Sequence, residues 1–222
     1  MKKIAGVFTG FDEKLYEIVS QALKNNLADV DYRLMVHANP DLIAKTLEAG
    51  YVTEEVAAKL LSIFSASVSE GADVILSVCS TMGDIAEAAQ PLFEKAGVPI
   101  IRIDEAMMHY AVCTYKRIAL IASCRTIMLP NKRLMEKSLR AEESDSSVTY
   151  IVIDEMQGKS GAEVSDIVIR EMLKYEGDFD VAVMTQASLG PFTKEIEEKL
   201  GIPVLSSPDF GAKEVFKRLK IA

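Results

Sequence analysis

The first candidate for chemistry is Cys79, a thiol that follows a short apolar run, residues 74–78, and precedes a stretch with helical periodicity. A cysteine between a buried strand and a helix lies where backbone N–H groups and the helix dipole favour negative charge. We expect this environment to lower the pKa of the thiol from its free value of about 8.5 and to produce thiolate. Thiolate can act as a base that removes a proton next to a carboxylate. Ser80 and Thr81 have hydroxyl and amide groups suited to holding that carboxylate.

Cys79 also has a purely structural interpretation, because free cysteine packs as a small hydrophobic residue. The chain has only three cysteines and two histidines, with no CxxC pair and no zinc spacing. Cys124 follows another apolar run, so it is either a second proton carrier or a packed thiol. His37 ends a third run and is a candidate acid, ligand donor or partner of a thiolate. Cys113 is expected in the core and His109 at a packing or interface position.

A sheet has to position these side chains. Short apolar runs alternate with amphipathic segments, which is typical of parallel strands covered on both faces. The expected strands are residues 4–8, 32–36, 74–78, 100–103, 118–121, 148–153, 181–184 and 204–205. Helices are expected after Thr53, over 130–139 and over about 162–175, with a surface loop at 141–147. The alternation predicts a doubly wound α/β architecture with right-handed crossovers.

The sequence also repeats itself. Residues 73–79 match residues 180–186 without gaps, and residues 94–100 match residues 198–204 around a shared Gly-x-Pro. Unrelated βαβ units can look alike, because Gly-x-Pro often separates a helix from a strand. The preserved order of the matches nevertheless favours two similar lobes.

Two such lobes predict where a site would form. Open α/β sheets bind ligands at the carboxyl ends of their strands, so the turns after Val78 and Thr185 should meet in a cleft between the lobes. We expect the first lobe to comprise residues 1–98 plus 207–222, and the second lobe to comprise residues 99–206.

Composition excludes several kinds of partner. A net charge of -8 repels nucleic acids and anionic membranes. No apolar run reaches the roughly 18 residues that span a bilayer, and the N-terminal apolar run is too short for a signal peptide. Three cysteines without a secretion signal favour reduced thiols in the cytoplasm.

The motif around Cys79, D-[VI]-[IV]-[IVL]-x-x-C followed by Ser-Thr, resembles the first catalytic cysteine of the aspartate/glutamate racemase superfamily. This superfamily includes glutamate, aspartate and hydantoin racemases, maleate isomerase and arylmalonate decarboxylase. With the repeat, the likeness covers essentially the whole chain. It implies two pseudo-symmetric flavodoxin-like lobes with mostly parallel sheets, a small carboxylate substrate, neither pyridoxal phosphate nor metal, and a homodimer. In the racemases, one cysteine from each lobe flanks the substrate α-carbon.

The resemblance also implies auxiliary positions. Thr9 ends the first expected strand, where relatives bind polar groups of the substrate. Ser123 and Thr126 correspond to donors that hold a carboxylate. Arg125 either pairs with a second carboxylate, for which its planar fork is suited, or lies solvated at a helix start.

The second lobe departs from the racemase pattern. The residue equivalent to Cys79 is Gln186, followed by Ala187 and Ser188, which we also expect to contact substrate. A neutral amide neither accepts nor donates a proton near pH 7, so racemisation through two thiols is unexpected. The open alternatives are a racemase-family isomerase, a single-cysteine decarboxylase or isomerase that protonates one face, and a non-catalytic carboxylate-binding protein. A nucleotide-binding protein is disfavoured, because residues 6–10 lack phosphate-binding spacing.

Overall fold

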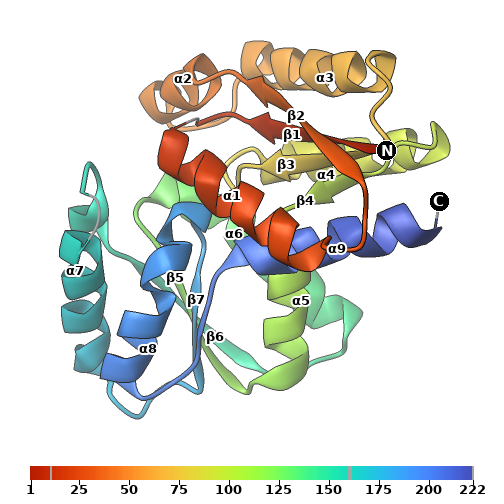
Figure 1. The fold of residues 1–222 in the computed structure, drawn as a ribbon. Coiled ribbons are helices and arrows are strands. Elements are labelled where there is room, and N and C mark those ends of the chain that lie inside the picture. The colour runs from red at the N-terminus through yellow and green to blue at the C-terminus, as the bar shows by residue number, and fades with distance from the viewer. Residues whose placement is uncertain (11, 160–161, 222) are drawn as a thin grey trace.

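Two separate four-stranded parallel sheets make up the computed structural model, which describes residues 1–10, 12–159 and 162–221 (Figure 1). The strands are β1 (Lys2–Phe8), β2 (Tyr32–Ala38), β3 (Val74–Val78), β4 (Ile100–Arg102), β5 (Arg117–Ala122), β6 (Ser147–Val152), β7 (Val181–Met184) and β8 (Val204–Leu205). The first sheet has the order β2-β1-β3-β4 and the second the order β6-β5-β7-β8. The two orders are equivalent, so the α/β class and the two-lobe architecture predicted from the sequence are confirmed.

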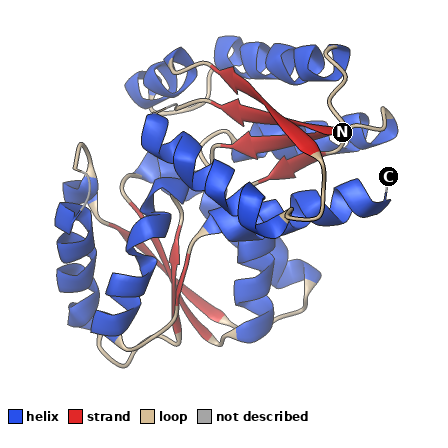
Figure 2. Cartoon of the chain, viewed as in Figure 1, coloured by secondary structure: helices blue, strands red, loops and turns tan. Residues whose placement is uncertain are grey.

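Helices cover both faces of each sheet (Figure 2). The helices are α1 (Glu13–Asn26), α2 (Asp41–Ala49), α3 (Glu54–Ser69), α4 (Gly83–Lys95), α5 (Glu105–Thr114), α6 (Arg125–Ala141), α7 (Ala162–Met172), α8 (Thr193–Leu200) and α9 (Ser207–Ile221), with short 3-10 helices η1 (Asp154–Met156), η2 (Leu173–Tyr175) and η3 (Ala187–Phe192). The first sheet packs on α1 and α9 on one face and on α2, α3 and α4 on the other. The second packs on α7 and α8 on one face and on α5 and α6 on the other.

The sequence repeat is visible in the way each lobe begins. Asp73 Oδ2 accepts a 2.6 Å hydrogen bond from the Lys3 N–H at the start of β1. Its counterpart in the repeat, Asp180, accepts a 2.9 Å bond from the Arg117 N–H at the start of β5. The same carboxylate-to-backbone contact therefore anchors the first strand of both lobes, which confirms the internal repeat.

Two sequence-based boundaries are wrong. The second lobe was expected to begin at residue 99, but β4 pairs with β3, so the first sheet continues through Arg102. The Gly97-Val98-Pro99 segment follows the end of helix α4 and so looks like a boundary between lobes. The strand after it, β4, is nevertheless the last strand of the first sheet. Helix α6 begins at Arg125 rather than at Pro130. Pro130 lies in its second turn, where the missing N–H leaves the Thr126 carbonyl without its helical donor.

Helix α9 returns the chain to the first lobe. Ala212, Val215 and Leu219 are buried in the same apolar cluster as the residues of β1 and β3. Gly211 permits this approach, because a Cβ there would lie 2.8 Å from Ile103 Cγ1. In the part of the chain that the structure describes, no helix is long and apolar enough to cross a membrane.

A buried cation lies beneath the start of α4. Arg102 is 1% exposed, and its Nε and Nη2 each donate a 3.0 Å hydrogen bond to the Asp104 carboxylate. Nη1 donates a 2.9 Å bond to Glu87. A Cβ at Gly83 would lie 2.2 Å from Arg102 Nη2, so the first turn of α4 requires glycine.

We therefore expect Gly83→Ala to lower the free energy of unfolding by about 1–3 kcal/mol, because the guanidinium can move only by breaking its buried ion pairs. Urea denaturation measures the loss. The matched control is Gly190→Ala, where the nearest atom to an added Cβ is Ser206 Oγ at 3.4 Å. Equal effects of the two substitutions would contradict the steric explanation.

Candidate active site

The turns that follow β3 and β7 meet between the lobes. The buried Ser80 Oγ donates a 2.7 Å hydrogen bond to the Thr185 carbonyl, across 105 positions of sequence. The structure thus brings together the two repeated turns, as expected. The Ser80 hydroxyl is already used as a donor here, so it links the lobes instead of being free to hold a carboxylate.

A cavity of 290 Å³ opens next to this contact and has walls from both lobes. Thr81 belongs to the turn after β3, and Thr126 to the first turn of α6. Their lining partners are Gly50, Tyr51, Val52, Asp84, Ile85, Leu129, Pro130 and Arg133. Asp84 and Arg133 form an ion pair that spans the two walls. Thr81 and Thr126, both predicted as substrate-binding residues, therefore share one interlobe cavity.

Cys79 directly follows β3 and is half-buried. Burial raises the pKa of its thiol above the ordinary value, although the side chains of Thr9 and Thr81 and the backbone N–H groups of Thr81 and Met82 are placed to donate to the thiolate once it forms. The expectation that the helix start would lower this pKa is wrong, because the loss of hydration outweighs these donors. The resting group is a thiol surrounded by groups that can stabilise its conjugate base.

Several buried polar atoms at the strand ends have no hydrogen-bond partner among the described residues. They include Thr9 Oγ1, Thr185 Oγ1 and Gln186 Oε1. Buried polar atoms are normally paired, so each of these is an available contact for a ligand or water. Thr9 gains an acceptor when Cys79 ionises.

The turn after β5 supplies the second-lobe candidates. Ser123 and Cys124 are buried, and Cys124 stands in extended conformation at the N-cap of α6. Arg125 is exposed and has no hydrogen bond or ion pair with the described residues. A cation in the first turn of a helix is opposed by the helix dipole, so Arg125 would gain from a bound anion.

Other predicted residues lie elsewhere or serve packing. His37 does not face the cleft; its ring lies against α3, with Nε2 3.7 Å from Glu70 Oε2. Ala187 and Ser188 are half-buried in η3, and Ala187 packs on the apolar cluster of the first lobe. The expectation that Cys113 belongs to the core is wrong, because it lies on the exposed side of α5.

Three residues that contribute to the junction or its cavity were not predicted from the sequence: Thr185, Tyr51 and Arg133. The Thr185 carbonyl accepts the hydrogen bond from Ser80 Oγ. Its position in the repeat, directly before Gln186, could have placed it at the junction. Tyr51 and Arg133 line the cavity, and no local pattern marks them, because they reach it only through the packing of one lobe against the other.

Fold and site together define a class: a two-lobed α/β protein with a cysteine at the junction of its lobes. The model of the family described as Asp/Glu/hydantoin racemase matches residues 13–215. The chain belongs to the Asp/Glu/hydantoin racemase family. A comparison with curated proteins finds no match.

Solved structures share the fold at low identity. A glutamate racemase from Bacillus anthracis superposes with a TM-score of 0.74 and 17% identity, covering 99% of this chain and 82% of that one. An allantoin racemase from Klebsiella pneumoniae superposes with a TM-score of 0.68 and 15% identity, covering 100% of this chain and 89% of that one. An unliganded arylmalonate decarboxylase superposes with a TM-score of 0.58 and 14% identity, covering 98% of this chain and 92% of that one.

The interlobe bond predicts a stability effect. Ser80→Ala should lower the free energy of unfolding by about 1–3 kcal/mol, because it leaves the buried Thr185 carbonyl without a donor. Ser65→Ala is the control, since that exposed hydroxyl bonds only to its own helix, and its effect should stay within about 0.5 kcal/mol. If Ser80→Ala matches the control in urea denaturation, the bond does not stabilise the folded protein.

The raised pKa of Cys79 predicts its reactivity. Alkylation consumes thiolate, so in a Cys113→Ser/Cys124→Ser protein the iodoacetamide rate should rise with pH, with a midpoint above that of the unfolded chain. Thr9→Val should move the midpoint higher still, because it removes a donor to the thiolate. A midpoint below that of the unfolded chain would contradict the dominance of burial.

Proposed function

We propose that the chain is a cofactor-independent enzyme that transfers a proton at a carbon next to the carboxylate of a small acid, with Cys79 as the proton carrier. The observation that carries this proposal is the surroundings of Cys79: a half-buried thiol at the end of β3, at the interlobe junction, with donors from Thr9, Thr81 and Met82 around it. These donors would stabilise the thiolate each time it forms.

The protonation state of Cys79 favours proton donation in the first step. In a decarboxylation, the bond between the α-carbon and one carboxylate breaks, CO₂ leaves, and the electron pair remains as an enediolate. The Cys79 S–H then gives its proton to that carbon, and water restores the thiol. In an isomerisation of an unsaturated acid, the thiol would first lose its proton to water, and the thiolate would then take the α-proton and return it to the γ-carbon on the same face, so that the double bond moves.

Gln186 supports a one-face reaction. It occupies the repeat position equivalent to Cys79, and its amide cannot carry a proton near pH 7. Its unpartnered Oε1 accepts hydrogen bonds, so we propose that it orients the substrate. Cys124, buried at the N-cap of α6, is the other thiol at the junction and the residue to test as a second carrier.

The substrate is proposed to be a small amino, hydroxy or malonate-type acid. The 290 Å³ cavity lies at the small end of ligand sites, which commonly occupy about 300–1,000 Å³. Thr81 and Thr126 line this cavity and would hold one carboxylate. Ser123, in the turn after β5, is proposed as a further donor although it does not line the cavity. Arg125, which is exposed and unpaired among the described residues, would hold a second carboxylate, which favours dicarboxylates.

A non-catalytic carboxylate-binding protein is the second candidate. The observation that favours it is Gln186 in place of a second thiol, combined with a Cys79 thiol that burial keeps protonated. Such a protein would use the same cavity without turnover.

Two further predictions concern the protein as a whole. We propose that it is a homodimer, which sedimentation equilibrium tests. We also propose that it is cytoplasmic with reduced thiols, which cell fractionation tests.

Cys79→Ala should lower turnover of the cognate acid at least about 100-fold, because it removes the proton carrier. Reaction in D₂O should place deuterium at the α-carbon with one configuration. Gln186→Cys should supply a thiol on the opposite face, so the product should lose optical purity. Chiral chromatography and mass spectrometry measure both outcomes.

The control for this experiment is Ser62→Ala, an exposed helix position outside the cavity, which should leave turnover unchanged. Full activity of Cys79→Ala would reject Cys79 as the carrier. Thermal stabilisation by dicarboxylates that Arg125→Ala abolishes, without turnover of any acid tested, would instead support the binding protein.

A further inference from the structure

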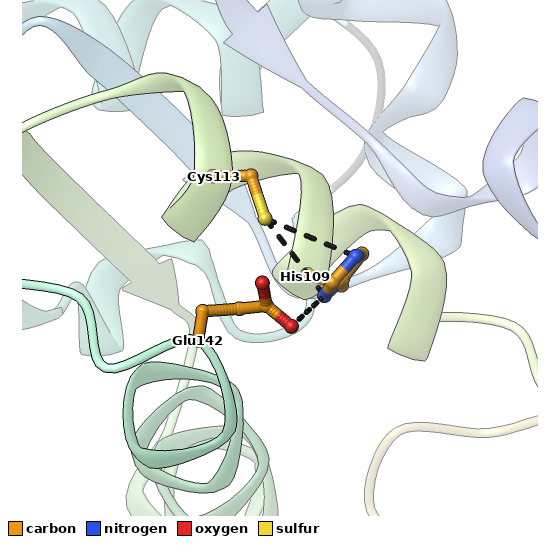
Figure 3. Close-up of side chains that lie close together, drawn as sticks. All are labelled: His109, Cys113 and Glu142. Carbon is orange, nitrogen blue, oxygen red and sulfur yellow. Dashed lines mark hydrogen bonds and ion pairs between the residues drawn. The ribbon is translucent and has the colours of Figure 1, made fainter.

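Three ligand-type side chains converge on the surface where α5 and α6 end (Figure 3). His109 and Cys113 are one turn apart on α5, so both project from the same face of that helix. Glu142 is the C-cap residue of α6. All three are exposed, and their ligand atoms lie within 4.8 Å of one another.

The distances approach those of a coordination sphere. Cys113 Sγ lies 3.8 Å from His109 Nε2 and 4.0 Å from Nδ1. His109 Nδ1 lies 3.5 Å from Glu142 Oε1. With Zn–S of about 2.3 Å and Zn–N of about 2.0 Å, tetrahedral geometry separates sulfur and nitrogen by about 3.5 Å. Because Sγ is nearly equidistant from the two ring nitrogens, binding through Nδ1 requires the exposed imidazole to turn until its lone pair faces the thiol.

We propose that His109, Cys113 and Glu142 form a site for a borderline-soft divalent cation such as Zn²⁺, with the remaining coordination position open to water. A thiolate, an imidazole and a carboxylate are the three side-chain ligands that Zn²⁺ takes in proteins. The thiolate and the carboxylate repel each other when both are charged, and a cation between them removes that repulsion.

The repulsion also weighs against a nucleophilic Cys–His–Glu arrangement. The Cys113 Sγ has the Glu142 carboxylate as a near neighbour, so an uncoordinated thiolate would be opposed rather than stabilised. The negative charge of Glu142 would hinder Cys113 as a nucleophile, but it would help to bind a metal ion.

This site is separate from the interlobe cavity. Cys113 is followed closely by Arg117, where β5 starts, and so lies at the amino ends of the second-sheet strands. Cys79, Ser80 and Thr126 belong to the carboxyl ends or to the turns after them. His109 and Cys113 instead border an 820 Å³ groove between α4, α5 and α9. Bound metal would join the last turn of α5 to the end of α6.

Titration of metal-free protein with Co²⁺ tests the proposal, because cobalt–thiolate coordination gives a charge-transfer absorption band. We expect one ion per chain, with the band lost in Cys113→Ser. His109→Asn and Glu142→Gln should each weaken binding at least about tenfold. Zn²⁺ should displace Co²⁺ and raise the Tm of the wild type, since it binds the folded chain.

Two matched controls locate the ion. Glu143→Gln removes a neighbouring exposed carboxylate, and Cys79→Ser removes the thiol of the cleft; both should bind as the wild type does. Cys113→Ser should keep the metal-free Tm and lose only the rise with Zn²⁺, which separates ligand loss from unfolding. Absence of the band in the wild type, or its survival in Cys113→Ser, overturns the proposal.

Discussion

The bond from Ser80 Oγ to the Thr185 carbonyl is the contact on which the candidate site depends. Each sheet is internally complete, with its own apolar clusters on both faces. A site between the lobes therefore exists only while the carboxyl edges of the two sheets are held together. Because this bond lies in the buried turns themselves, it fixes their separation more directly than the surface ion pairs that also connect the lobes, such as Asp84 with Arg133.

Pseudo-symmetry explains why the chain can keep its architecture while the chemistry of its two halves differs. Asp73 and Asp180 perform the same structural task at the starts of β1 and β5. Cys79 and Gln186 are equivalent in the sequence repeat, but one is a titratable thiol and the other a neutral amide. The residues that fix strand order and anchor the strands are thus different from the residues at the junction. The junction residues can therefore change in one lobe without disturbing the fold.

Much of the fold followed from the sequence, because strands buried on both faces leave continuous apolar runs and because the repeat links equivalent elements. The meeting of the turns after Val78 and Thr185 followed from the rule on strand carboxyl ends. Local patterns failed where tertiary environment decides. The pKa of Cys79 depends on how much water its neighbours exclude, and the orientation of His37 depends on the packing of α3.

Helix α9 gives the chain a discontinuous first lobe, since residues after β8 fill one apolar face of the first sheet. Until those residues leave the ribosome, the surface that Val215 and Leu219 cover stays open to water. The second lobe, encoded in between, can assemble sooner. Synthesis therefore imposes an order in which the earlier-made lobe is the last to be completed, and until then α1 alone covers a sheet face that α9 later shares.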